Sequence, residues 1–231
     1  MNVAEPLVRR TLAFVTRLAL LTDLHFWQRL IQLNLGLMIF GLAISLMLRA
    51  DLGLDPWSVL HEGLSARTGL SFGRVTQLVG LALLIFNFFA LRVRPGLGTV
   101  LNMALVGPWV DFFEAQRWLP RAEDLGSGIA LVTVGVILTG LASGLYLGAR
   151  MNAGPRDTLV LGSARRFGRS VRLTRGSIEV LVLTVGFLLG GTVGLGTVIF
   201  ALLIGPTMQF FLGVFRYEHL PVAGVTSAAS G

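Results

Sequence analysis

The chain has 231 residues, of which 54% are hydrophobic and 13% are charged, and its mean hydropathy is +0.76. Soluble domains carry about a quarter charged residues, so this composition excludes an ordinary soluble enzyme and is typical of membrane proteins. Arginine alone supplies the basic side chains behind the net charge of +7, because the sequence contains no lysine. Arginines between apolar segments indicate membrane topology and contact with anionic lipid, not a nucleic-acid partner. The lack of cysteine excludes disulfides, thiolate nucleophiles and cysteine-bound metals.

Six segments are long and apolar enough to cross the hydrocarbon core, which needs about 20 residues. They are residues 28–49, 72–91, 97–115, 127–149, 173–191 and 195–215. We therefore expect an all-α polytopic membrane protein with six transmembrane helices. With the N-terminus in the cytoplasm, 14 of the 19 arginines lie on the cytoplasmic side. The positive-inside rule favours this orientation, in which both termini are cytoplasmic.

The segments outside the spans are short. Residues 1–27 carry Arg9, Arg10 and Arg17 among apolar side chains, which predicts an amphipathic helix on the cytoplasmic membrane surface. A partly disordered arginine-rich tail is the alternative. We expect an external loop over residues 116–126 and a cytoplasmic tail over residues 216–231.

Glycines recur in the first and fourth spans at an offset of 99 residues. Gly36 and Gly41 correspond to Gly135 and Gly140, and the fourth span continues the spacing with Gly144 and Gly148. Small residues at such spacing let helices approach closely in lipid, so they predict a tight helix–helix contact.

A short segment opening with proline follows each of these two spans, over residues 54–66 and 154–166. Pro56 and Pro155 suit the first position of a helix, where a missing N–H costs nothing. Asp55 is a good N-cap in front of the first of them. Neither segment is long enough to cross the membrane. Each is therefore either a re-entrant half-helix or a helix lying flat on the membrane surface.

The third and sixth spans open with the same four residues, Gly-Leu-Gly-Thr, at 96–99 and 194–197. Gly107-Pro108 recurs as Gly205-Pro206 at the same offset of 98. A proline at this depth removes one backbone hydrogen bond and predicts a kinked or broken helix. The carbonyl that it frees must face protein or a water-filled cavity.

These matches predict that residues 28–115 and 127–215 are two copies of one unit, each with three spans and one short helix. An odd number of spans places the two units in opposite orientations across the membrane. Inverted repeats with interrupted helices are typical of secondary transporters, whose solute site lies near the midplane between the repeats.

Several polar side chains lie within the spans. Glu179 is either a functional carboxylate or the partner of Arg175 one turn earlier. Asp111 is either functional or an acid wetted by the outer headgroups. Asn34, Asn87 and Asn102 are more typical of hydrogen bonds between helices.

The residues Leu52-Gly53-x2-Pro56-Trp57-Ser58-Val59-Leu60, then Gly63-Leu64-Ser65 and Thr68-Gly69-Leu70-Ser71-Phe72-Gly73, resemble the YczE/YitT-type bacterial membrane proteins, and the YczE branch most closely. The resemblance covers about residues 28–215 and includes Gly96-Leu97-Gly98-Thr99. It implies location in the bacterial inner membrane and a role in transport, without naming a solute. The second half departs from the pattern, because Arg156-Asp157 stand where the first half has Trp57-Ser58. We expect Arg156 and Asp157 to form a cytoplasmic gate or a recognition pair.

The function favoured by these features is secondary transport of a small polar or anionic solute by alternating access. The candidate solute-binding residues are Asp55, Pro56, Trp57, Asn102, Gly107, Pro108, Asp111, Asn152, Pro155, Arg156, Asp157, Glu179, Gly205, Pro206 and Gln209. A membrane scaffold or regulatory protein without flux is the alternative. An intramembrane enzyme is a remote one, because no histidine lies inside a span to activate a serine. We expect membrane lipid and a small solute as partners, a homo-oligomer through the glycine-rich faces as an option, and no cofactor or metal.

Overall fold

The computed structural model describes residues 24–215, which form eight α-helices and no strand. The helices are α2 (Leu24–Ala50), α3 (Pro56–Thr68), α4 (Phe72–Phe89), α5 (Leu97–Glu114), α6 (Leu125–Gly148), α7 (Pro155–Phe167), α8 (Val171–Leu188) and α9 (Leu195–Val214). The first span therefore begins at Leu24, earlier than expected. Residues 1–23 of the expected amphipathic segment and the tail over residues 216–231 lie outside the described residues.

Within that part of the chain, four helices are long and apolar enough to cross a membrane: α2, α4, α6 and α9. The helices expected as the third and fifth spans, α5 and α8, have 18 residues each but more polar sequences. α5 contains Asp111 and Glu114, and α8 contains Arg172, Arg175 and Glu179.

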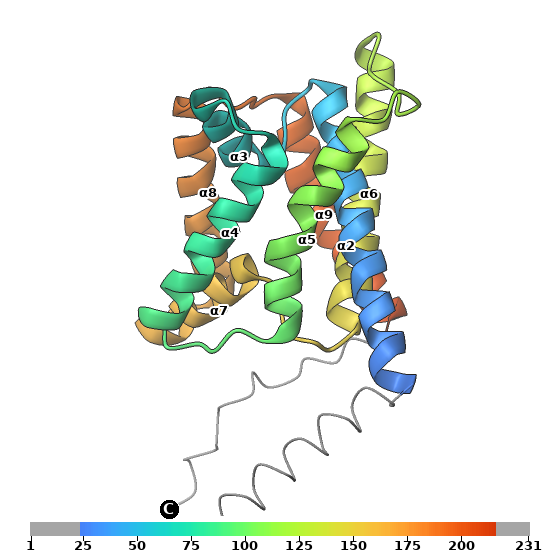
Figure 1. The fold of residues 1–231 in the computed structure, drawn as a ribbon. Helices are drawn as coiled ribbons and strands as arrows, with labels where there is room; N and C mark the ends of the chain where they lie inside the picture. Colours follow the sequence, from blue (N-terminus) through green and yellow to red (C-terminus); the bar gives the residue numbers. More distant parts are fainter. Residues whose placement is uncertain (1–23, 216–231) are drawn as a thin grey trace, which may run out of the picture.

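The eight helices form two groups (Figure 1). In one group α2 packs along α6, and these two contact α5 and α9 respectively. In the other, α3 packs on α8 and α7 on α4. The groups meet mainly where α4 packs along α5.

Helices at matching places in the two halves run in opposite directions in Figure 1. α2 and α5 rise from the lower end, whereas α6 and α9 descend from the upper end. The short helix α3 lies at the upper end and α7 lies at the lower end.

The glycines of α2 and α6 make the predicted close contact. A Cβ added at Gly36 would lie 2.8 Å from the backbone nitrogen of Tyr146, and one at Gly135 would lie 2.7 Å from Cγ of Met47. These distances are below van der Waals contact, so neither helix tolerates a side chain there without moving. Tyr146 and Met47 are themselves separated by the repeat offset of 99, so the same contact is made twice.

Both short helices begin and end alike. Pro56 and Pro155 occupy the first helical position, as predicted, and Asp55 accepts hydrogen bonds from the backbone N–H groups of Trp57 and Ser58 at 3.2 and 3.3 Å. Gly69 and Gly168 end the two helices with φ of 70° and 62°, a left-handed conformation that glycine adopts without strain.

The Gly-Leu-Gly-Thr motif of each half contacts the extended segment that precedes the short helix of the other half. The N–H of Gly98 donates to Met151 O at 2.6 Å, and the N–H of Gly196 donates to Leu52 O, also at 2.6 Å. A Cβ at Gly98 would overlap Met151 O, and one at Gly196 would overlap Gly53 O. Each copy of the motif therefore needs its second glycine, because the backbone of the other half lies where a side chain would be.

The proline-containing helices are not broken. α5 continues through Pro108 and α9 through Pro206, so of the two predicted effects, a kink or a break, the break does not occur. Pro108 leaves the carbonyl of Ala104 without its helical donor. Nε2 of Gln77, on α4, donates to this oxygen at 2.8 Å. The freed carbonyl thus faces protein, which is why the helix persists.

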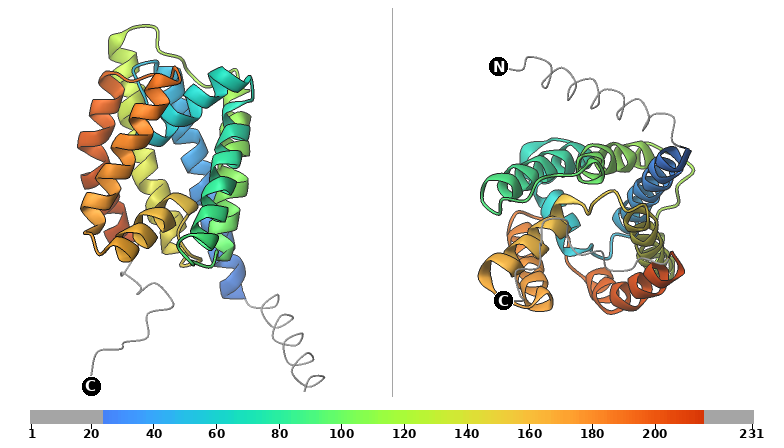
Figure 2. Two further views of the ribbon diagram at one scale, coloured as in Figure 1. Left: turned by 90° about the vertical axis from the view of Figure 1, so that its left-hand side faces the viewer. Right: turned by 90° about the horizontal axis from the view of Figure 1, so that it is seen from below.

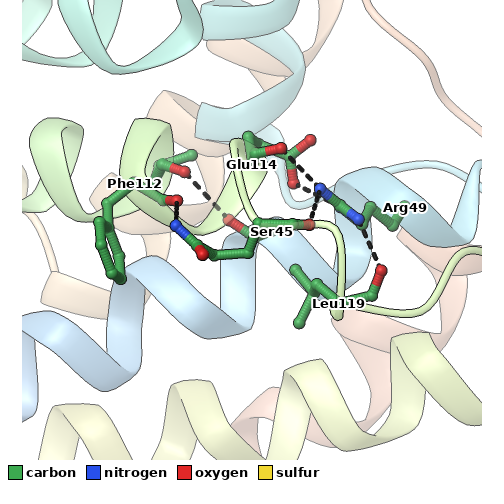
Figure 3. Close-up of polar contacts among 7 residues, drawn as sticks. Ser45, Arg49, Phe112, Glu114 and Leu119 are labelled. Carbon is green, nitrogen blue, oxygen red and sulfur yellow. Dashed lines mark hydrogen bonds and ion pairs between the residues drawn. The ribbon is translucent and has the colours of Figure 1, made fainter.

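Arg49 joins the end of α2 to the end of α5 (Figure 3). It is 8% exposed, and its guanidinium donates to Leu119 O and Glu114 O, both at 2.6 Å, to Gln116 O at 3.1 Å and to Oε1 of Glu114 at 3.2 Å. A cation is favourable at the carbonyl end of a helix. At the other end of the bundle Arg29 donates to Ala149 O at 2.6 Å, just after α6.

We predict that Gly196→Ala lowers the melting temperature of the purified protein in detergent. The added methyl group would be forced against the backbone at Gly53, and overpacking of this kind costs about 1–3 kcal/mol. Gly213→Ala is the matched control, because Gly213 lies in the same helix and a Cβ there meets no atom within 4 Å. Equal melting temperatures for the two variants would contradict the close contact.

Candidate functional site

The first turns of α3 and α7 meet inside the molecule, although the two short helices lie at opposite ends of the bundle (Figure 1). The guanidinium carbon of Arg156, the second residue of α7, lies 5.2 Å from the centre of the Trp57 ring, which belongs to the second residue of α3. This is a cation–π contact. Trp57 is 8% exposed, so the contact is interior.

His61 lies one turn after Trp57 on α3 and also contacts Arg156. Nη2 of Arg156 is 3.3 Å from Nδ1 and 3.5 Å from Nε2 of the imidazole. The Thr76 hydroxyl, on α4, donates to Phe72 O at 2.9 Å and lies 3.1 Å from Nδ1 of His61. We assign the Nδ1–H to the Thr76 oxygen, which leaves the lone pair on Nε2, 3.5 Å from Nη2 of Arg156. Burial, and then the charge of Arg156, lower the pKa of His61 well below its ordinary value, in keeping with a neutral ring.

Two carboxylates lie close enough to the Arg156 guanidinium to affect its pKa. Burial lowers the pKa of Arg156, and the negative charges of Asp55 and Asp157 act in the opposite direction. Asp55 is 8% exposed and serves as the N-cap of α3, while Asp157 accepts a hydrogen bond from the hydroxyl of Tyr146 on α6. The arrangement brings together one guanidinium, two carboxylates and an aromatic face.

The first turn of α7 is held by both neighbouring helices. Nδ2 of Asn87, on α4, donates to Pro155 O at 2.9 Å. On α5, Asn102 lies against Gly154, since a Cβ added there would be 2.9 Å from Oδ1 of Asn102. Gly154 is the N-cap of α7 and provides no capping side chain. The predicted residues Asp55, Pro56, Trp57, Asn102, Pro155, Arg156 and Asp157 are therefore brought together around the two first turns.

Asp111 and Gly107 lie instead along the contact of α4 with α5. Oδ2 of Asp111 accepts from the Ser71 hydroxyl at 2.6 Å, and Oδ1 accepts from the N–H of Gly73 at 2.8 Å. Gly107 is packed against Gly73 in the same contact. Pro108 is exposed beside them on α5.

The other predicted residues lie elsewhere. Gly205, Pro206 and Gln209 are exposed on α9. Asn152 has a φ of 77°, and its side chain lies against Gly96. Oε1 of Glu179 pairs with Nε of Arg175 at 2.9 Å, as the second of the two interpretations of Glu179 predicts. The expected hydrogen bonds between helices are present for Asn87 and for Asn34, which accepts from Nε1 of Trp109 at 3.4 Å.

Sequence reasoning missed three side chains of the site: His61, Thr76 and Tyr146. A signal existed for His61, because it follows Trp57 by four residues and so shares its helical face. Tyr146 and Thr76 reach the site only through the packing of α6 and α4. No group of three His, Cys, Asp or Glu side chains within residues 24–215 is placed to hold a metal ion.

The family of unknown function DUF6198 matches residues 27–213 of the chain. The chain belongs to this family. A relative from Haemophilus influenzae, described as an uncharacterized protein, is 37% identical over 187 residues, which are 80% of this chain and 84% of that one. No solved structure matches the chain.

Two relatives come from Bacillus subtilis. The uncharacterized membrane protein YczE is 33% identical over 178 residues, 77% of this chain and 82% of its own. The uncharacterized protein YyaS is 27% identical over 189 residues, 81% of this chain and 94% of its own. The resemblance to the YczE-type membrane proteins is confirmed, and the matched region agrees with the 28–215 expected.

We predict that Asp55→Ala lowers the melting temperature of the purified protein whereas Asp55→Asn leaves it nearly unchanged. The carboxylate caps α3, and asparagine caps a helix about as well, whereas loss of a cap to alanine costs about 0.5–2 kcal/mol. The comparison separates capping from charge. Equal destabilisation by both substitutions would show that the negative charge beside Arg156, not the cap, stabilises the fold.

Proposed function

We propose that this membrane protein is a secondary transporter of a small polar or anionic solute and works by alternating access between two inverted repeats. The observation that carries the proposal is the meeting of Trp57 and Arg156, from the first turns of two short helices that come from opposite ends of the bundle. Half-helices whose N-termini converge near the midplane form the solute site in several transporter folds.

The proposal takes α5 and α8 as the remaining two spans, which gives three per repeat. Both helices run beside the four apolar ones in Figure 1. Most of their charges lie toward one end: Asp111 and Glu114 are in the last turn of α5, and Arg172 and Arg175 are in the first turns of α8. Glu179, in the middle of α8, is paired with Arg175. Charges near the ends of a span are tolerated because their side chains reach the headgroups.

The proposed orientation places the lower end of Figure 1 in the cytoplasm. The connections at that end carry Arg92, Arg94 and Arg150, and α7 adds Arg165 and Arg166. The inner membrane of a bacterium and cytoplasmic termini follow from this distribution under the positive-inside rule. In this setting α3 and α7 are re-entrant half-helices that enter from opposite sides.

The chemistry of the site supports a small polar or anionic solute. The N–H groups at the start of α3 and α7 carry partial positive charge, and Arg156 adds a full one. Trp57 supplies a flat apolar surface, while neutral His61 and the carboxylates of Asp55 and Asp157 can accept hydrogen bonds from a solute. The proposal assigns no catalytic residue.

The test is a thermal-shift screen of the purified protein with small carboxylates, phosphate and neutral polar solutes, followed by flux in proteoliposomes. A solute that binds only the folded protein raises its melting temperature. We predict that Arg156→Gln weakens binding of that solute about tenfold or more, since a hydrogen bond to a charged group contributes about 1.5–3 kcal/mol. Arg121→Gln, in an exposed loop, is the control and should bind like the wild type.

Flux that persists unchanged in Arg156→Gln would contradict the proposed site. The scaffold alternative would be favoured if no solute raises the melting temperature or crosses the membrane and the protein stably captures a partner protein.

A further inference from the structure

One pair of helices departs most from the correspondence between the two halves. α4 packs along α5, but the equivalent helices α8 and α9 make no such contact. Figure 2, seen from below, shows α4 beside α5 and a separation between α8 and α9. The other main contacts between helices occur in matching pairs, α2–α5 with α6–α9, α3–α8 with α4–α7 and α3–α4 with α7–α8, whereas the smaller contact of α5 with α7 has no comparable counterpart between α9 and α3.

Three residue pairs lie along the α4–α5 contact. Gly73 packs on Gly107 backbone to backbone, Gln77 donates to Ala104 O, and a Cβ added at Gly80 would lie 3.5 Å from Cβ of Met103. Asp111 adds its two hydrogen bonds to the first turn of α4. The contact is therefore continuous along the two helices.

The equivalent surfaces of α8 and α9 are uncovered. α4 and α8 begin 99 residues apart and α5 and α9 begin 98 apart, so Gln77 corresponds to Gly176, Ala104 to Leu202 and Gly107 to Gly205. A Cβ at Gly176 or Gly205 meets no atom within 4 Å, and Leu202 is 69% exposed. At the equivalent positions the second half thus has Gly176, Leu202 and Gly205, together with Arg172, Glu179 and Ala201.

We propose that the group α3, α4, α7 and α8 rocks against the other four helices, exchanging the α4–α5 contact seen here for an α8–α9 contact. The described structure is one of the two states. The occupant of the uncovered face of α9 is then α8 of the same chain. This exchange rests on the proposed function. It would open the site at the first turns of α3 and α7 first to one end of the bundle and then to the other.

The connections between helices permit such a movement. α3 contacts both α4 and α8, and α7 contacts the same two helices, so these four form one unit. This unit meets the others mainly through α4 and α5. Arg172 and Glu179 stand where α4 has Gly73 and Gly80, so the α8–α9 contact would be centred on Gly176 and be less close. Glu179 would move together with Arg175, its partner on the same helix.

Disulfide trapping tests the exchange, and the chain contains no cysteine that would interfere. The reference pair is Gly80→Cys with Met103→Cys, whose Cβ separation of 3.5 Å suits a disulfide. The test pair is its equivalent, Glu179→Cys with Ala201→Cys. A second test pair, Gly176→Cys with Leu202→Cys, retains Glu179. The variants are oxidised in membrane vesicles, and linked peptides are identified by mass spectrometry in mixtures of isotopically light and heavy chains.

We expect the reference pair and at least one test pair to form disulfides within single chains. In a chain that carries both pairs, we expect disulfide formation by one pair to prevent it in the other. Failure of both test pairs, in variants that remain monodisperse and keep a wild-type melting temperature, would overturn the proposal. Test disulfides only between light and heavy chains would also overturn it, because a second copy would then cover this face. The oxidation needs no solute, so the two proposals are tested separately. The disulfides can show the exchange even if the transport assay fails, and transport can be found even if the disulfides do not form.

Discussion

The contact on which the rest of the structure depends is the reciprocal docking of each Gly-Leu-Gly-Thr motif on the extended segment of the opposite half. Gly98 and Gly196 donate to backbone oxygens of Met151 and Leu52, and a Cβ on either glycine would overlap backbone. The extended segments lead directly into α7 and α3. Their docking therefore fixes where each short helix begins and carries Arg156 and Trp57 into the interior.

This constraint explains why the sequence repeat is most exact at glycines that make backbone contacts and less exact at the candidate site. A transported solute needs particular side chains, whereas a backbone-to-backbone contact needs the absence of one. Gly36 and Gly135 are retained for the same reason in the contact of α2 with α6. The site itself has diverged, with Trp57 in one half and Arg156 in the other. Most helix contacts of the two halves correspond, whereas the side chains at the first turns of α3 and α7 differ.

Much of the fold was predictable because local signals mark its boundaries. Pro56 and Pro155 began the short helices, and the glycines of α2 and α6 indicated their close contact. The effect of Pro108 was not predictable, because the donor that replaces its missing hydrogen bond is Gln77 on another helix. Tyr146 was missed for a similar reason, since only packing of α6 on α7 places it at Asp157. The sequence shows that both motifs exist, but it does not show that each contacts the extended segment of the other half.

The arginines divide by what their guanidinium groups contact. Arg29 and Arg49 bind carbonyls at or just after a helix end, so residues that report topology also hold the bundle together. Arg156 instead faces the Trp57 ring and His61. A guanidinium held by a π face and a neutral imidazole keeps donors for a further partner, which is the physical basis for placing a solute there.

The central claim is that the two halves lie in opposite orientations in the membrane and dock on each other. Labelling of single cysteines with a membrane-impermeant maleimide in intact cells tests it most directly, at Arg94→Cys between α4 and α5 and at Val193→Cys between α8 and α9. Both positions are exposed at equivalent connections of the two halves. The account predicts that Val193→Cys is labelled from outside and that Arg94→Cys is labelled only after the cells are permeabilised. Labelling of both positions from the same side would contradict it.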